Sequence, residues 1–158
     1  MKTGRPPGWV LDAQGPGSGA IDIRAIDSRG RISIPPRFLP LLPWVDAKST
    51  TCLLVLDSPG QVRVLPWEPT ASKILERRRL SMELGDWESV LLMDDRYLRA
   101  TIETSRLALP DLALAHLEPS KLISTLYLVA ASDLFEIWSV AYRNKLRTKA
   151  GAGLESLP

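Results

Sequence analysis

The chain has 158 residues, of which 45% are hydrophobic, 24% charged and 6% aromatic. This composition is typical of one compact domain or two small ones and excludes a disordered or fibrous chain. Twenty Lys and Arg side chains stand against eighteen Asp and Glu, so the formal net charge is only +2. We therefore expect any nucleic-acid site to be local rather than spread over a basic surface.

Cysteine, histidine and hydropathy exclude several further classes of protein. The single cysteine and single histidine, Cys52 and His116, rule out an intrachain disulfide framework and a Cys/His zinc site within one chain. No apolar run approaches the roughly 20 residues that span a bilayer, and the Gly- and Pro-broken start lacks the apolar stretch of a signal peptide. We expect a cytoplasmic protein without metal, cofactor or membrane partner.

The first predicted elements form a hairpin behind a flexible arm. Residues 1–19 are rich in Gly and Pro and show no period, which predicts a flexible N-terminal arm. Apolar and charged residues then alternate over 21–25, as on a half-buried strand, and alternate again over 31–34. Between them, residues 27–30 have turn chemistry, and the prolines from Pro35 onward favour one short helical turn.

A second hairpin and two helices follow. The apolar run 52–56, the turn 57–60 and the run 62–65 predict two more strands. Thr70 is a candidate N-cap for a helix over 71–82, whose apolar positions fall on one side. Asp86 is a candidate N-cap for the next helix, which we expect to direct four apolar side chains inward, namely Trp87, Val90, Leu91 and Leu98.

The order of elements then repeats. Residues 24–35 are echoed by residues 99–110, since both run from Arg-Ala through a polar turn to Arg-apolar-small-apolar-Pro. The later strands and a helix over 140–149 echo the second hairpin and its helix. A half of roughly 50 residues buries little surface alone, so we expect the two halves to share one core. The predicted divisions are a first repeat with its helix (20–85), a connecting helix (86–96), a second repeat (97–149) and a flexible tail (150–158).

Two motifs resemble those of a known family. Residues 27–35, Asp-Ser-Arg-Gly-Arg-Ile-Ser-Ile-Pro, resemble the Asp-x-Lys-Gly-Arg-apolar-Ser-apolar-Pro signature of the MraZ family. Residues 135–138, Phe-Glu-Ile-Trp, resemble the Phe-Glu-Ile-Trp of that family's second repeat. The match extends over about residues 20–149. The second copy of the first motif has decayed, because the stretch 103–106 has no glycine and one residue fewer.

The resemblance implies a fold and a function. The implied fold is α+β, with two tandem AbrB-like swapped-hairpin repeats forming one pseudo-symmetric β core with peripheral helices. The implied function is sequence-specific binding of double-stranded DNA as a transcriptional regulator. By resemblance, the regulator acts as a homo-oligomer, expected to be a ring, on direct repeats in the promoter of a division and cell-wall gene cluster. The resemblance also implies a cytoplasmic protein that is associated with the nucleoid.

The first turn carries the chemistry that DNA binding needs. Arg29 and Arg31 bracket Gly30 and are expected to extend two guanidinium groups from the sheet. The planar fork of arginine donates paired hydrogen bonds to phosphates and guanine edges. Asp27 and Gly30 are expected to orient the motif, Gly30 within the tight connection and Asp27 because its carboxylate can accept from turn amides or from Arg31.

Four other arginines are further candidates for DNA contacts, with Arg24 and Arg37 expected to bind DNA together with the first turn. Arg24 lies on the preceding strand and Arg37 on the short helix, whereas Arg99 and Arg106 are possible contacts of the second repeat. Residues 1–50 have seven basic and four acidic side chains, a net charge of +3, while residues 51–100 and 101–158 have net charges of −1 and 0. The positive charge is therefore concentrated around the first motif.

The sequence also allows two functions other than DNA binding and argues against a third. Near-neutral charge and the decayed second motif are compatible with an oligomeric partner-binding or scaffold protein that has lost DNA binding. An AbrB-like antitoxin that binds a toxin through its tail is a weaker alternative. An enzyme is not expected, because the acidic residues form no evident catalytic pair and neither His116 nor Cys52 lies in a catalytic motif.

Overall fold

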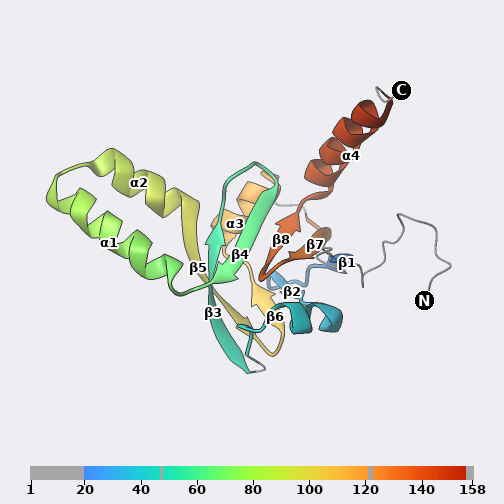
Figure 1. The fold of residues 1–158 in the computed structure, drawn as a ribbon, viewed down its shortest axis with the longest axis horizontal. Coiled ribbons are helices and arrows are strands. Elements are labelled where there is room, and N and C mark those ends of the chain that lie inside the picture. The colour runs from blue at the N-terminus through green and yellow to red at the C-terminus, as the bar shows by residue number, and fades with distance from the viewer. Residues whose placement is uncertain (1–19, 47, 121–122, 156–158) are drawn as a thin grey trace.

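One eight-stranded antiparallel sheet forms the centre of the molecule, and helices lie outside it (Figure 1). The computed structural model describes residues 20–46, 48–120 and 123–155. The predicted arm, residues 1–19, and the last three residues lie outside the described residues. The expected α+β class, with a β core and peripheral helices, is confirmed.

The elements follow the predicted order. The strands are β1 (Ala20–Ala25), β2 (Arg31–Ser33), β3 (Ser49–Val55), β4 (Gln61–Pro66), β5 (Tyr97–Glu103), β6 (Arg106–Ala108), β7 (Thr125–Ala131) and β8 (Leu134–Trp138). The helices are the 3-10 helix η1 (Pro36–Leu41), α1 (Thr70–Glu83), α2 (Trp87–Arg96), α3 (Asp111–Leu117) and α4 (Val140–Glu155).

The sheet is almost closed into a barrel. Its strand order is β1-β7-β8-β4-β3-β5-β6-β2, with every neighbouring pair antiparallel. At the two ends of this order, β1 and β2 are joined by a single bridge between Ile26 and Ile32. A seam therefore remains beside most of β1.

Neighbour relations in the barrel are the same for the two halves of the chain. β1 pairs with β7 and β5 with β3, β7 pairs with β8 and β3 with β4, and β4 pairs with β8 and β2 with β6. The β5–β6 pairing corresponds to the single bridge between β1 and β2. Exchanging β1 to β4 with β5 to β8 leaves every one of these relations unchanged. This symmetry supports the two-repeat interpretation, whose boundaries stay predictions.

The core fills the inside of this barrel. Strand alternation turns every second residue inward, so both hairpins of each half contribute large apolar side chains to one cluster. The largest fully buried side chains are those of Phe38, Phe135, Ile32, Leu42, Leu54, Ile102, Leu107, Leu126, Leu128, Ile137, Val62 and Val64. Cys52 is also buried, and burial raises the pKa of its thiol to about 12.

One of the two helix caps is predicted correctly. Asp86 is the N-cap of α2, where its carboxylate accepts from the Ser89 amide at 3.2 Å. Thr70 is not a cap, because α1 already includes it and Pro69 occupies the N-cap position. The Glu68 carboxylate accepts from the Ser72 amide instead, at 3.1 Å.

The predicted burial of the α1–α2 hairpin is largely wrong. Of its predicted inward residues, Val90 is buried, whereas Trp87 and Leu91 are exposed. Leu98 packs partly buried against the core, but it lies on β5, because α2 ends at Arg96. The hairpin projects from one side of the barrel, so only its base packs on the sheet (Figure 1). Its exposed apolar side chains range from 42% exposed for Met82 to 83% for Leu84 and also include Leu75, Leu80 and Leu92.

The last helix is longer than predicted. α4 runs to Glu155 rather than ending at Lys149, so the stretch predicted as a tail is helical as far as Glu155. It leaves the barrel on the side opposite the α1–α2 hairpin (Figure 1). Within the described ranges, none of the helices combines the length and apolar character that crossing a bilayer requires.

We predict that truncating a barrel side chain is far more costly than truncating an exposed one. Leu54→Ala should lower the free energy of unfolding by about 2–5 kcal/mol, because it leaves a cavity in a close-packed core. Leu112, on α3, is 57% exposed, and Leu112→Ala should cost less than about 0.5 kcal/mol. Urea unfolding followed by circular dichroism measures both values, and equal losses would contradict this assignment of the core.

Candidate nucleic-acid interface

The turn between β1 and β2 is tight and internally bonded. The Asp27 amide donates to the Arg31 carbonyl oxygen at 2.9 Å, and the Gly30 amide donates to the Asp27 carbonyl oxygen at 3.1 Å. Gly30 has φ of +76°, a conformation that suits glycine because it has no Cβ. The Gly30 carbonyl oxygen accepts from the Leu109 amide at 2.9 Å, which attaches the turn to the start of α3.

The Asp27 carboxylate holds both ends of the turn. One oxygen accepts from the Arg29 and Arg31 amides, each at 2.8 Å, and the other accepts from Arg31 Nε at 2.8 Å. These contacts, first the Arg31 amide and then those of the Arg29 amide and the Arg31 guanidinium, hold the pKa of the Asp27 carboxyl below its ordinary value of 3.8. The carboxylate is therefore ionised at neutral pH and keeps the backbone of the turn in one shape.

The two arginines of the turn differ in their contacts. Arg29 is exposed, and its guanidinium has no hydrogen-bond or ion-pair partner within the described residues. The Arg31 side chain is 34% exposed and is held by Asp27 through Nε. The turn thus presents one guanidinium without a partner beside a second one of fixed orientation. Such a pair is chemically suited to phosphate oxygens or to the O6 and N7 atoms of guanine.

Arg24 and Arg37 lie at a separate place, beside the seam of the barrel. Both contact the Asp22 carboxylate, at 3.5 and 3.4 Å, and Arg37 Nη2 donates to the Ile21 carbonyl oxygen at 2.7 Å. Arg24 pairs with Leu126 across β1 and β7 and so lies on the core side of β1, where its Nε is buried without a partner. The structure therefore places these two arginines against the barrel rather than on the turn.

The two second-repeat arginines are not brought to the first turn. In the β2–β6 ladder Arg31 pairs with Ala108 and Ser33 with Arg106, so the two turns lie at opposite ends of this strand pair. Arg106 is exposed beside the second turn. Arg99 lies on the outer face of β5, with its guanidinium 5.4 Å from the centre of the Trp67 ring.

The alignment of Arg24 with Arg99 is wrong. Arg24 stands three residues before the acid that opens its turn, Asp27, but Arg99 stands four residues before Glu103. Because a strand alternates its faces, this one-residue difference puts Arg24 on the inner face and Arg99 on the outer face. The structural counterpart of Arg24 is therefore Ala100, which is buried.

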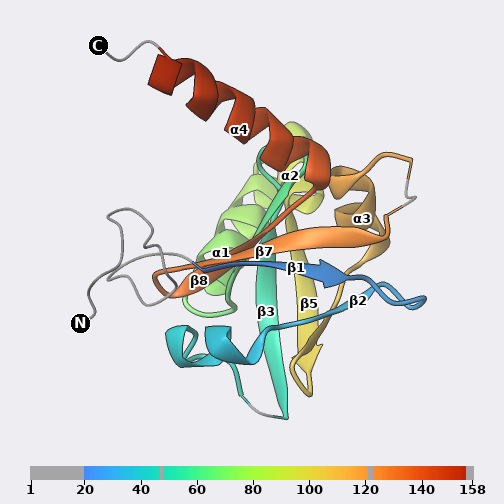
Figure 2. The same cartoon turned by 90° about the vertical axis from the view of Figure 1, so that its right-hand side faces the viewer.

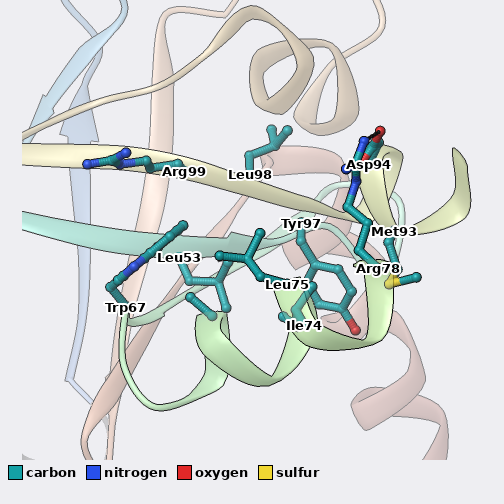
Figure 3. Close-up of a pocket in the computed structure, with 11 residues that line it drawn as sticks. Leu53, Trp67, Ile74, Leu75, Arg78, Met93, Asp94, Tyr97, Leu98 and Arg99 are labelled. Atoms are coloured by element: carbon teal, nitrogen blue, oxygen red, sulfur yellow. Dashed lines mark hydrogen bonds and ion pairs between the residues drawn. The ribbon is translucent and has the colours of Figure 1, made fainter. Parts of the chain in front are cut away.

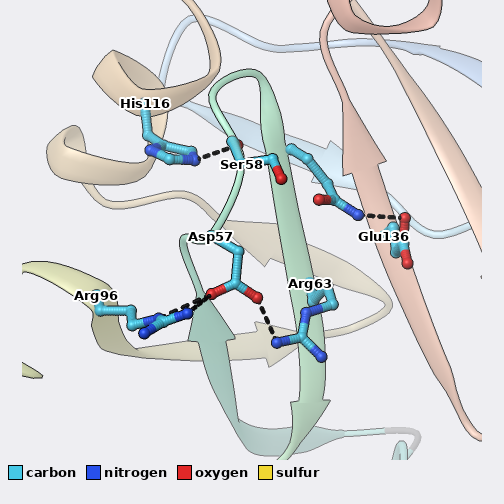
Figure 4. Close-up of polar contacts among 7 residues, drawn as sticks. Asp57, Ser58, Arg63, Arg96, His116 and Glu136 are labelled. Atoms are coloured by element: carbon cyan, nitrogen blue, oxygen red, sulfur yellow. Dashed lines mark hydrogen bonds and ion pairs between the residues drawn. The ribbon is translucent and has the colours of Figure 1, made fainter. Parts of the chain in front are cut away.

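Sequence analysis missed a polar network beneath the β3–β4 turn (Figure 4). Asp57 accepts from Arg96, at 2.8 Å from Nε, and also from Arg63, so it joins β4 to the end of α2. Burial raises the pKa of the Asp57 carboxyl, but these hydrogen bonds outweigh it and hold the pKa below 3.8. The His116 Nε2 atom lies 2.6 Å from the Ser58 carbonyl oxygen. Asp57 and Arg96 are 39 residues apart in the sequence, so no local pattern predicts their contact.

An apolar pocket of about 220 Å³ lies under the base of the α1–α2 hairpin (Figure 3). Leu53, Ile74 and Leu75 line its middle, and Trp67 with Arg99 closes one end. At the other end Arg78 donates to both carboxylate oxygens of Asp94, at 2.7 and 2.9 Å, which ties α1 to α2. The pocket adds to the apolar surface of the hairpin and lies apart from the first turn.

Comparison with known proteins agrees with the motifs. No family model matches the chain. The chain is 29% identical over 138 residues to a protein named "Transcriptional regulator MraZ" from Dechloromonas aromatica (strain RCB), an alignment that covers 81% of this chain and 86% of that protein. The chain is similar to this MraZ over most of its length. The resemblance to the MraZ family carried by the first turn and by residues 135–138 is thereby confirmed, and the name of this MraZ describes a regulator rather than an enzyme.

We predict that the Asp27 carboxyl titrates below 3.8 in the folded protein and that Arg31→Gln reverses only part of this lowering. The largest cause is the backbone amide of residue 31, which the substitution keeps. Because the folded pKa lies below the unfolded one, the contribution of Asp27 to stability is present above that unfolded value and is lost as the pH falls through the folded pKa. Carbon-detected NMR titration measures the pKa of the Asp27 carboxyl in the wild-type protein and in the variant. A wild-type pKa at or above 3.8 would contradict the turn geometry.

Proposed function

We propose that this MraZ relative is a DNA-binding transcriptional regulator and that the β1–β2 turn is its contact with DNA. The observation that carries the proposal is the pair formed by Arg29, which is exposed without a partner, and Arg31, which Asp27 orients. Because the Arg31 guanidinium is already held in one orientation, it loses little conformational freedom on binding. The exposed Arg29 guanidinium is available to a phosphate or a base. The name of the MraZ relative supports regulation of transcription.

Regulation of one promoter needs more affinity than a single turn supplies. Two to four phosphate contacts per chain give weak, salt-sensitive binding. Several copies acting on repeated sites raise the apparent affinity through effective concentration. We therefore propose a homo-oligomer, in the form of a ring, on direct repeats in a promoter, as the family resemblance implies.

The α1–α2 hairpin is the surface that we assign to self-association. Its apolar side chains, among them Leu84 and Trp87, are exposed although they are large. Large apolar side chains that are exposed together on one hairpin commonly mark an interaction site. The same surface also supports the alternative function, a scaffold that binds protein partners and not DNA.

DNA binding by the first turn makes a direct prediction. In fluorescence anisotropy, the protein should bind duplex DNA from upstream of its own gene more tightly than a scrambled duplex. Arg29→Ala/Arg31→Ala should abolish this preference and reduce the slope of log K against log salt by about 1.8, or 0.9 for each lost phosphate contact.

A matched variant tests whether the place of the charges matters. Lys48→Ala removes a positive charge from an exposed lysine that lies outside both the first turn and the α1–α2 hairpin, and it should leave the preference unchanged. Absence of binding by the folded wild-type protein at low salt would reject the regulator in favour of the scaffold.

Self-association through the hairpin is tested by sedimentation velocity. Leu91→Ser/Leu92→Ser should lower the mass of the assembly, because it makes two exposed leucines of α2 polar without disturbing the barrel core. Leu112→Ser, at an exposed leucine on α3, is the control and should keep the wild-type mass. An unchanged mass in the hairpin variant would move the interface elsewhere.

A further inference from the structure

The last helix carries a concentration of positive charge that the regional sums hide. Residues 101–158 have a net charge of zero, yet residues 140–154 contain four basic side chains and no acidic one. Among the described residues none of these four side chains forms an ion pair, and the Arg143 guanidinium lies over the Tyr127 ring, 4.6 Å from its centre. Lys145, Arg147 and Lys149 are exposed. A helix with unpaired cations is suited to a polyanion.

The cations form two stripes on opposite sides of α4. Successive residues of an α-helix are about 100° apart, so residues four apart fall nearly in line. Arg143 and Arg147 form one stripe, and Lys145 and Lys149 form a second one about 200° away.

Between the stripes the helix has two unlike faces. One face carries the polar side chains of Asn144 and Thr148, which are both exposed. The other carries Tyr142 and Leu146, which are half-buried. Two cationic stripes with a polar face between them match a major groove, which is about 12 Å wide, admits an α-helix and has a phosphate backbone on each side.

The start of α4 lies at the same end of the sheet as the first turn. Ala25, at the end of β1, pairs with Thr125, and Trp138, at the end of β8, pairs with Tyr127. The start of α4 and the start of the first turn therefore lie at the same end of these three strands. From there α4 extends away from the barrel and away from the first turn, on the side that also carries β1 and β7 (Figure 2).

We propose that α4 is a second DNA-binding element, which lies in the major groove of duplex DNA. Its two cationic stripes contact the two phosphate backbones, and Asn144 and Thr148 face the base edges. The 16-residue helix is about 24 Å long, which corresponds to about seven base pairs. This inference rests on the proposed DNA-binding function and adds to it a second contact with bases. An interfacial membrane helix would need a broad apolar face, whereas the face between the two stripes carries Tyr142, Leu146 and Ala150 in the part of α4 whose side chains are described.

The first experiment removes the exposed cations. Lys145→Gln/Arg147→Gln/Lys149→Gln keeps good helix formers and should reduce the salt slope for binding by about 2.7 per chain. Affinity should fall by the same factor for the native and the scrambled duplex, by about 10- to 100-fold near 0.15 M salt, because phosphate contacts carry no sequence information. The charge-conserving variant Lys145→Arg/Arg147→Lys/Lys149→Arg is the control and should keep the wild-type slope.

The second experiment tests the polar face. Asn144→Ala leaves the charge unchanged, so it should keep the salt slope but lower the preference for the native duplex, by about fivefold or more for a lost pair of hydrogen bonds to a base. An unchanged preference would overturn the assignment of this face to base edges.

Outcomes for α4 and for the first turn are distinguishable. If the triple Gln variant keeps the wild-type slope while Arg29→Ala/Arg31→Ala loses the preference, α4 is not a DNA contact but the proposed function stands. If the wild-type protein binds both duplexes equally and the triple variant loses slope, α4 binds DNA but sequence-specific regulation fails. The same proteins are also tested for binding to anionic vesicles. If the triple Gln variant loses vesicle binding that the wild-type protein shows, while its salt slope for duplex DNA is unchanged, the DNA assignment is overturned in favour of a membrane surface.

Discussion

The pairing of strands between the two halves of the chain is the constraint on which the rest of the structure depends. β1 has its full ladder with β7, and β2 pairs with β6, so neither strand of the first hairpin has a full-length partner in its own half. The turn between them is also bonded across the halves, since its Gly30 carbonyl oxygen accepts from Leu109 and the Ile26 amide donates to Ser124. The candidate site therefore has its shape only when both halves are folded together. Unlike a local hairpin, it shares the cooperativity of the whole barrel.

Within that frame, electrostatic contacts decide which arginines are available. The Asp27 carboxylate accepts from Arg31 Nε, and the Arg29 guanidinium has no partner among the described residues. By contrast, Asp22 lies within ion-pair distance of both Arg24 and Arg37. Surface ion pairs of this kind contribute little to stability, but they fix where a guanidinium points. Four arginines that are equivalent in sequence thus divide into two at an exposed turn and two along the barrel seam. Acidic neighbours, more than the arginines themselves, set this division.

Local patterns predict the strands, the first turn and the order of elements, because alternation and turn residues act over a few positions. They do not predict which side of a helix is covered. Leu91 has the spacing of a core residue, but the α1–α2 hairpin leaves the barrel and Leu91 stays exposed. Nor does motif alignment detect that a turn shorter by one residue moves Arg99 to the outer face. The link from Asp57 to Arg96 joins distant residues and follows from the fold alone.

The cations of the first turn and of α4 lie apart from the apolar surface of the hairpin. They are on the side of β1 and α4, whereas the large exposed apolar side chains are concentrated on the α1–α2 hairpin on the opposite side of the barrel (Figure 1). The hairpin also carries the exposed cations Lys73 and Arg77, and because desolvating a cation in an apolar interface is costly, self-association through the hairpin must leave these two side chains in water or pair them with acidic ones. Copies joined in this way keep their cationic sides open to the same polyanion. In such an assembly the weak contacts of each chain combine, because each bound copy raises the effective concentration of the next.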